Sequence, residues 1–234
     1  MIYVMSDIHG EYGKYRRMLE KIRFSDEDAL YILGDVVDRG PEPVKLLQNM
    51  AVRENVFPIM GNHDAMARRL LEELLVEITE ENAESHIDGG LLREIMEWMA
   101  DGGDKTMKDF KRIGAEERAD LIDYLGDFEL YEAVDVGEKT FILIHAGLHN
   151  FAPGRRLSSY RPDELLFERH DYSRRYFDDP SVFIVTGHTP TLSISGKAEI
   201  YRANNNILID CGAAFEGGRL ACLCLDTMEE YYID

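Results

Sequence analysis

The sequence predicts an α/β fold built on parallel strands, and two observations lead to this prediction. Short apolar runs, each long enough for one buried strand, alternate along the chain with segments in which apolar residues recur at helical spacing. The first three runs each end in a polar turn that contains glycine, as expected where a chain passes from a strand towards a helix. Repeated units of this kind give a βαβαβ arrangement with a parallel sheet.

The first sixty residues supply three strands and two helices. The strands are expected at residues 2–5, 29–33 and 56–60. Between the first two strands, Tyr15, Met18 and Ile22 lie on one face of a helix. A second helix is expected to begin at Pro41, because proline is favoured in the first helical turn, and to place Met50 on its inner face.

Between about residues 65 and 126 the chain has helical patterns only. Three of them are expected, at about 66–78, which includes Ile78, at 91–99 and at 116–125. Apolar strand-like runs then resume at 140–144, 182–185, 207–209, 220–225 and 230–233. We therefore expect one domain over residues 1–234, with a helical insertion at about 65–126.

Length and composition limit the class of protein. A chain of 234 residues with 45% hydrophobic residues can bury one large core. It has no apolar run near the roughly 20 residues that cross a bilayer and no basic segment before the first strand, so we expect a cytoplasmic protein without a membrane span or signal peptide. Cys211, Cys222 and Cys224 lie in apolar stretches and are expected in the core. The net charge of −19 argues against nucleic acid and anionic membranes as partners.

Five of the apolar runs end in turns that carry chemically active side chains. These are Asp7 and His9; Asp35, Asp38 and Arg39; Asn62 and His63; His145; and His188. The carboxyl ends of parallel strands meet at one edge of a sheet, so we expect these side chains to converge there. Carboxylate, imidazole and amide donors together suit a first-row transition metal.

Each turn alone also has a plain structural explanation. Asp35, Asp38 and Arg39 can form an ion pair within their turn, and a single histidine at a strand end can be a satisfied core residue. Asp64 is expected to cap a helix that starts at Ala65. The occurrence of all five turns at successive strand ends favours the metal site.

Taken together, the motifs resemble those of a known family. They are Asp7-Ile8-His9-Gly10, Gly34-Asp35-Val36-Val37-Asp38-Arg39-Gly40, Gly61-Asn62-His63-Asp64, His145-Ala146-Gly147 and Gly187-His188. In this order they resemble the metallophosphoesterases, and specifically the calcineurin-like phosphoprotein phosphatases of the bacterial serine/threonine type. The resemblance runs from Ile2 to about Leu225. It implies an α/β sandwich of two central mixed β-sheets flanked by helices.

The resemblance also implies a binuclear metal centre. In it, Asp7, His9 and Asp35 hold one ion, and Asp35 bridges to a second ion that Asn62, His145 and His188 complete. Manganese is the metal expected, with iron, zinc, nickel and cobalt as alternatives. A hydroxide shared by two such ions can attack phosphorus at neutral pH.

The catalytic residues implied are His63, Asp38, Arg39 and Arg169. His63 would act as general acid, paired with Asp38, while Arg39 grips the phosphoryl oxygens. Arg169 follows a Leu-Leu-aromatic stretch in which Phe167 stands where bacterial relatives more often have tryptophan. Arg174 and Arg175 are the alternatives to Arg169. A pattern of Trp98, two glycines and Thr106 resembles bacterial members and is expected to form one wall of the substrate groove.

The function expected is metal-dependent hydrolysis of phosphoserine, phosphothreonine and possibly phosphotyrosine in proteins or peptides. The alternative is a symmetrical dinucleoside polyphosphate hydrolase, which shares the fold and nearly all ligands. Asp38 favours the protein phosphatase, because those hydrolases commonly have a non-acidic residue there. Small phosphorylated metabolites, RNA 5′ ends and a catalytically inert binding module also stay open. His86, His149 and His170 match no ligand position and are expected at the surface or in loops. The sequence does not indicate an oligomeric state.

Overall fold

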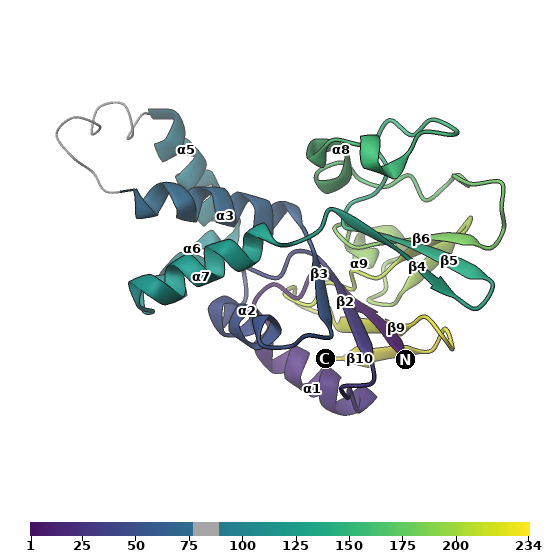
Figure 1. Cartoon of the computed structure of the whole chain (residues 1–234), viewed down its shortest axis with the longest axis horizontal. Helices are drawn as coiled ribbons and strands as arrows, with labels where there is room; N and C mark the ends of the chain where they lie inside the picture. The colour runs from purple at the N-terminus through teal and green to yellow at the C-terminus, as the bar shows by residue number, and fades with distance from the viewer. Residues whose placement is uncertain (77–88) are drawn as a thin grey trace.

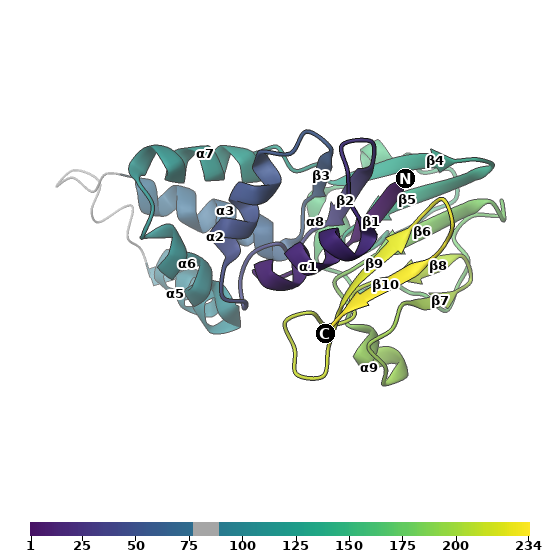
Figure 2. The ribbon, with the colours of Figure 1, turned by 90° about the horizontal axis from the view of Figure 1, so that it is seen from below.

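A computed structural model describes residues 1–76 and 89–234 of the chain. Its centre is two five-stranded sheets packed face to face (Figure 1 and Figure 2). The first sheet, in the order β10-β9-β1-β2-β3, contains β1 (Ile2–Met5), β2 (Ala29–Leu33), β3 (Val56–Ile59), β9 (Leu220–Cys224) and β10 (Glu230–Ile233). The second, in the order β4-β5-β6-β8-β7, contains β4 (Tyr131–Val136), β5 (Lys139–Ile144), β6 (Val182–Thr186), β7 (Tyr201–Ala203) and β8 (Asn206–Leu208).

Both sheets are mixed, which confirms the predicted fold. Strands β1, β2 and β3 are parallel, whereas β9 is antiparallel to both β1 and β10. In the second sheet β5, β6 and β8 are parallel, and β4 and β7 are antiparallel edge strands. Strands β4 and β7 were not expected from the sequence, because β4 buries only Val134 and β7 has only three residues.

Helices cover the outer faces of the sandwich (Figure 1). Those before β4 are α1 (Tyr12–Ile22), α2 (Pro43–Ala51), α3 (Asn62–Leu75), α5 (Gly89–Trp98), the π-helical turn η1 (Met99–Gly103), α6 (Asp104–Phe110) and α7 (Ala115–Gly126). Those between β5 and β7 are the 3₁₀ turn η2 (Leu157–Ser159), α8 (Pro162–Leu166) and α9 (Thr191–Ser195).

Alternating side chains divide the core into layers. Val4 on β1, Leu33 on β2 and Phe141 on β5 pack between the two sheets. Met5, the next residue after Val4, points to the opposite face and packs with α1, α2, α3 and α7. On the far side of the second sheet, Ile144 packs against α8. Burial of apolar side chains in these layers supplies the main stabilisation of the sandwich.

Several local expectations need correction. Helix α2 begins at Pro43 instead of Pro41, because Gly40 and Glu42 use their N–H groups to bind the carbonyls of His9 and Gly10, at 2.8 and 3.0 Å. Helix α3 begins at Asn62 instead of at Ala65. Ile78 and His86 lie outside the described residues. The three cysteines are buried and unpaired, which confirms their place in the core.

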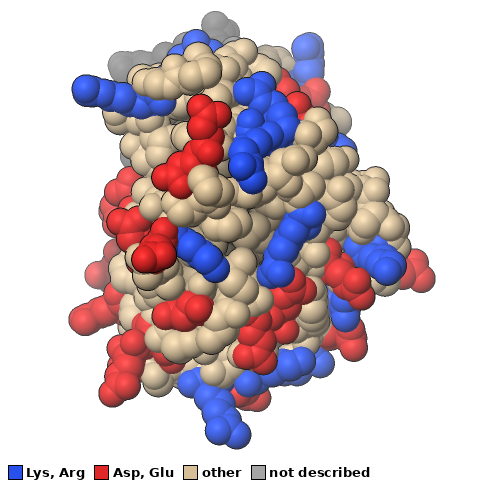
Figure 3. Space-filling model, turned by 90° about the vertical axis from the view of Figure 1, so that its right-hand side faces the viewer, with Lys and Arg blue, Asp and Glu red and all other residues tan. Residues whose placement is uncertain are grey.

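Two expectations from composition concern membrane-spanning helices and the distribution of surface charge. In this part of the chain, no helix combines the length and apolar character needed to cross a membrane. Acidic and basic side chains are interspersed on the face shown in Figure 3, which carries no broad basic area.

Candidate metal centre

The turns after β1, β2, β3, β5 and β6 meet at one edge of the sandwich. Backbone hydrogen bonds hold the first two side by side, since the N–H groups of Asp7 and His9 donate to the carbonyls of Gly34 and Asp35 at 3.0 and 2.9 Å. In the second sheet, the Gly187 N–H donates to the His145 carbonyl at 2.8 Å. The predicted convergence of strand ends is therefore present.

The backbone of these turns is strained in a way that marks functional sites. Six residues have left-handed conformations with φ between 47° and 70°: Asp7, His9, Asp35, Asp38, Arg39 and His188. Such conformations cost about 1–3 kcal/mol each in a residue that has a Cβ atom. Their concentration at one place indicates that the surrounding fold maintains them for the position of the side chains.

Gly61 allows the turns after β2 and β3 to touch. A Cβ atom at this position would lie 2.2 Å from the Asp35 nitrogen and 2.3 Å from its Oδ1 atom. The contact brings the Asp35 carboxylate against the first turn of α3, where Oδ1 accepts the His63 N–H at 3.0 Å. Only glycine permits this approach.

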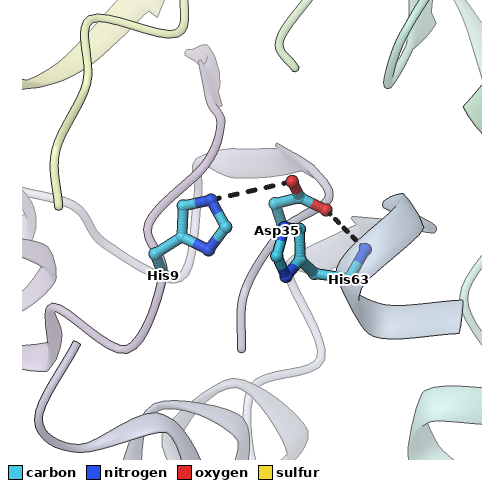
Figure 4. A group of neighbouring side chains, drawn as sticks. All are labelled: His9, Asp35 and His63. Carbon is cyan, nitrogen blue, oxygen red and sulfur yellow. Dashed lines mark hydrogen bonds and ion pairs between the residues drawn. The ribbon is translucent and has the colours of Figure 1, made fainter. Parts of the chain in front are cut away.

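The Asp35 carboxylate lies between two groups of ring nitrogens. Figure 4 shows the first group, with Asp35 next to His9 and His63. Its Oδ2 atom is 3.7 Å from Nε2 of His9, and its Oδ1 atom is 3.4 Å from Nε2 of His145. Burial by itself raises the pKa of Asp35, but the neighbouring imidazoles of His145, His63 and His9 lower it, and the net shift is downward. Asp35 is therefore an anion at neutral pH, placed to serve two cations at once.

On the second side, the potential ligand atoms of His145, Asn62 and His188 converge. His145 uses Nδ1 to donate to the Leu33 carbonyl at 2.7 Å, so its Nε2 atom carries a lone pair in the neutral ring. That lone pair points at Oδ1 of Asn62, 2.9 Å away, and Nδ1 of His188 is 2.9 Å from the same oxygen. Acceptors that converge in this way suit a cation, so these residues fit a metal ion.

On the side of Asp35 that faces His9, the residues that come together differ from the expected set. His9 donates from Nδ1 to the Val37 carbonyl at 2.9 Å, which leaves its Nε2 lone pair directed into the site. The structure brings His9, Asp35 and His63 together, with one ligand atom of each within 4.8 Å of the others. Asp7 is not part of this group: its carboxylate accepts the Ser6 hydroxyl and, at 3.0 Å, the His188 N–H.

Asp210 is a buried carboxyl that the sequence analysis missed. It lies beside Asp7, whose pKa is raised by burial, by Asp210 and by Asp35. Burial raises the pKa of Asp210 itself to about 7, although it accepts the Gly212 N–H at 2.8 Å. Its signal was available, because Asp210 directly follows the apolar run 207–209, as Asp7 and Asp35 follow theirs.

Asp38 is held by four hydrogen bonds and is completely buried. Its Oδ2 atom accepts from Nδ1 of His63 and from Nε1 of Trp98, both at 2.8 Å. Its Oδ1 atom accepts the Thr106 hydroxyl at 2.6 Å, and its own N–H donates back to that hydroxyl oxygen at 2.9 Å. Asp38 therefore fixes the orientation and tautomer of His63.

The Trp98 and Thr106 side chains are buried and do not themselves line a groove, whereas Asp101, which lies between them in the sequence, lines a cavity. Trp98 has no exposed surface and Thr106 has 1%. Between them, Gly102 adopts φ +108° and its carbonyl accepts the Arg39 N–H at 3.0 Å. The helical insertion thus supports the turn that contains Asp38 and Arg39 through these hydrogen bonds.

Thr106→Val is expected to destabilise the protein by about 1–3 kcal/mol, because it removes the hydroxyl partner of the buried Asp38 carboxylate and N–H while keeping side-chain volume. Urea denaturation measures the change. Thr227→Val serves as the matched control, since Thr227 is exposed and its loss should change the free energy of unfolding by less than about 0.5 kcal/mol. Equal stability of the Thr106 and Thr227 variants would show that the hydroxyl does not hold Asp38.

Arg39 places its guanidinium at the mouth of the site. Nη1 lies 2.7 Å from Nε2 of His9, and Nη2 lies 2.8 Å from Nε2 of His63. Nη2 also donates to Oδ1 of Asp101 at 3.2 Å, a contact that the sequence did not predict. The planar fork of guanidinium donors suits phosphate oxygens better than a lysine would.

Of the three candidate arginines, Arg169 adds its charge to the surroundings of His188. Burial and the neighbouring His145 lower the pKa of His188 to about 4, and the positive charge of Arg169 adds to this shift. Arg174 instead lies over the rings of Phe151 and Tyr176, and Arg175 donates to Asn205 at 3.2 Å. His149 is exposed as expected, whereas His170 is a buried loop residue that bonds to Asn206, so a surface position is wrong for it.

Residues 1–215 match the family model of calcineurin-like phosphoesterases. The chain belongs to this family. The described residues include groups of side chains able to bind metal.

Part of the chain is similar in sequence to a named enzyme. A stretch of 64 residues is 44% identical to the symmetrical bis(5′-nucleosyl)-tetraphosphatase of Buchnera aphidicola subsp. Acyrthosiphon pisum (strain 5A), covering 26% of this chain and 23% of that protein. The match thus spans about a quarter of the length of this relative.

Two solved structures share the fold of this calcineurin-like phosphoesterase. A candidate diadenosine tetraphosphatase has a TM-score of 0.64 at 17% identity and covers 99% of this chain and 92% of its own. A serine/threonine protein phosphatase from Saccharomyces cerevisiae has a TM-score of 0.55 at 13% identity and covers 94% and 71%. Both likenesses concern the fold alone.

The phosphorylated protein or peptide expected as partner is wrong, because the sequence relatives are named for a bis(5′-nucleosyl) tetraphosphate, a small nucleotide. The expectation depended on Asp38. That carboxylate is buried and accepts hydrogen bonds from His63, Trp98 and Thr106, so its contacts position His63.

Proposed function

We propose that this phosphoesterase is a symmetrical dinucleoside polyphosphate hydrolase, which cleaves diadenosine tetraphosphate into two molecules of ADP. The observation that carries the chemistry is the Asp35 carboxylate, which faces His9 with one oxygen and His145 with the other. The named sequence relatives support the substrate class.

In this proposal Asp7, His9 and Asp35 would hold one divalent ion, and Asp35, Asn62, His145 and His188 would hold a second. When bound, such ions supply Lewis acidity for phosphate oxygens and lower the pKa of a water nucleophile. Manganese is the metal proposed for both positions.

The remaining residues act on the substrate directly. Arg39, and Arg169 beside His188, bind oxygens of the central phosphates, whose negative charge grows on the leaving side during the reaction. As the oxygen of water joins one central phosphorus atom, the bond to the other half breaks. His63 then gives the proton on Nε2 to the departing ADP oxygen, while Asp38 stabilises the imidazolium through Nδ1.

The test is a steady-state assay of metal-stripped protein reconstituted with manganese. Diadenosine tetraphosphate and a phosphothreonine peptide are supplied at matched concentrations, and the nucleotide products are separated by chromatography. We expect ADP as the sole nucleotide product and a kcat/KM at least about a hundredfold above that for the peptide, a gap of about 2.7 kcal/mol in transition-state stabilisation. Formation of AMP and ATP, or phosphate release from the peptide alone, would contradict the proposal.

A further inference from the structure

A cavity of about 520 Å³ opens beside the candidate metal centre and has no part in the chemistry described above. Helix α3, helix α5 with η1, and the residue that follows α8 enclose it. Its lining residues are Ala65, Met66, Arg69, Glu94, Glu97, Asp101 and Phe167. A volume of this size is typical of sites for small organic ligands.

Two lining residues connect the cavity to the catalytic groups. Asp101 contacts Arg39 at 3.2 Å through Oδ1 and lies 3.5 Å from Nε2 of His63 through Oδ2. The backbone of Phe167 lies near the ring of His188. A substrate whose phosphates lie over Arg39 therefore has an adjacent cavity within reach of the rest of the molecule.

The apolar part of the lining offers a surface for a flat ring. The Phe167 side chain is large and hydrophobic, yet the residue is 50% exposed. Met66 and Ala65 extend this surface along α3, one turn beyond Asn62 and His63. Stacking of a nucleobase on an aromatic ring contributes about 1–3 kcal/mol and works with any base.

The charges of the lining indicate which end of a nucleotide the cavity suits. It has three carboxylates, from Glu94, Glu97 and Asp101, against one guanidinium, from Arg69, which is already paired with Glu94. Such a lining repels a polyphosphate chain. It accepts hydrogen bonds from uncharged donors, such as ribose hydroxyls and the exocyclic amine of adenine.

We propose that this cavity binds the nucleoside of one half of the dinucleotide, with its base stacked on Phe167. The polyphosphate then leads away from the carboxylates and over Arg39 to the reacting centre. This inference rests on the proposed function, because it names the site that would recognise the nucleoside part of that substrate.

The experiment compares wild type with Phe167→Ala on two substrates, diadenosine tetraphosphate and inorganic tetraphosphate, which has the same anhydride bonds and no base. We expect Phe167→Ala to raise KM for the dinucleotide about tenfold or more and to leave kcat/KM for inorganic tetraphosphate within about twofold. Phe167→Trp keeps an aromatic ring and should restore the KM. Phe57→Ala, which removes an exposed phenylalanine on β3 outside the cavity, should leave both substrates unaffected.

Binding of ADP, measured by calorimetry on wild type and Phe167→Ala, separates this inference from the proposed function. If wild type makes no ADP from the dinucleotide, the proposed function fails, and the cavity is then judged by ADP binding alone. Weaker ADP binding in Phe167→Ala supports the nucleoside site. Equal ADP binding by the two proteins would overturn it, and so would equal losses of kcat/KM on diadenosine tetraphosphate and inorganic tetraphosphate. A Phe167→Ala variant that weakens only the turnover of a phosphopeptide would also overturn it.

Discussion

Asp35→Asn is expected to remove the bound metal and the activity together. The carboxylate faces both His9 and His145, and its negative charge would offset part of the charge of two divalent ions. An asparagine keeps the shape but has no charge and only one acceptor oxygen. We expect fewer than one equivalent of metal after reconstitution and a fall in kcat/KM of at least about a thousandfold, since metal ions contribute several kcal/mol to transition-state stabilisation.

Metal content is measured by mass spectrometry on reconstituted, desalted protein, alongside turnover of diadenosine tetraphosphate. Asp163→Asn is the matched control, because Asp163 is an exposed carboxylate on α8 that pairs with Arg161. It should keep two equivalents of metal and full activity. An Asp35→Asn protein that retains two equivalents would contradict the bridging position of Asp35.

His63→Asn is expected to lower kcat at least about tenfold while metal content stays unchanged. His63 is positioned by Asp38 and would donate the proton to the leaving oxygen, an effect typically worth 10²–10⁴-fold in general acid catalysis. The loss of kcat should be larger for alkyl phosphomonoesters than for activated aryl esters, because an alkoxide is a more basic leaving group and its departure depends more on protonation. Kinetics on a leaving-group series measure this dependence.

The pH profile distinguishes a proton donor from a merely structural histidine. Burial lowers the pKa of His63, but the hydrogen bond to Asp38 and the negative charges of Asp35 and Asp38 together raise it, and the net shift is upward. The protonated acid therefore persists to higher pH, and kcat should fall as the pH rises through this raised pKa. The alkaline fall should disappear in His63→Asn. Loss of metal in that variant, or an unchanged alkaline limb, would rule out the general-acid role.

The pattern of apolar runs predicted a parallel sheet whose polar strand ends converge, whereas the two-sheet sandwich was implied by the resemblance to the family. Apolar runs determine where β1, β2, β3, β5 and β6 lie, and the carboxyl ends of parallel strands meet at one edge. A polar residue that directly follows such a run is therefore placed by the sheet itself. The same rule predicted the positions of Asp35 and His145. It applies equally to Asp210, which was not among the predicted site residues.

Contacts that come from the helical insertion could not be predicted in this way. Trp98 lies 60 positions from Asp38, and its helical pattern indicates a helix without indicating what the helix packs against. The π-helical turn that directs Asp101 towards Arg39 and His63 has no signal beyond two glycines. The substrate class was mistaken for a related reason, because burial of Asp38 behind His63 depends on these same long-range contacts.

A crystal structure of the protein with manganese, with anomalous difference maps, tests the proposed metal centre most directly. We predict two anomalous peaks, one on each side of the Asp35 carboxylate, with the first contacted by Asp7 and His9 and the second by Asn62, His145 and His188. A single peak, or a pair in which Asp35 contacts only one ion, would contradict the binuclear centre.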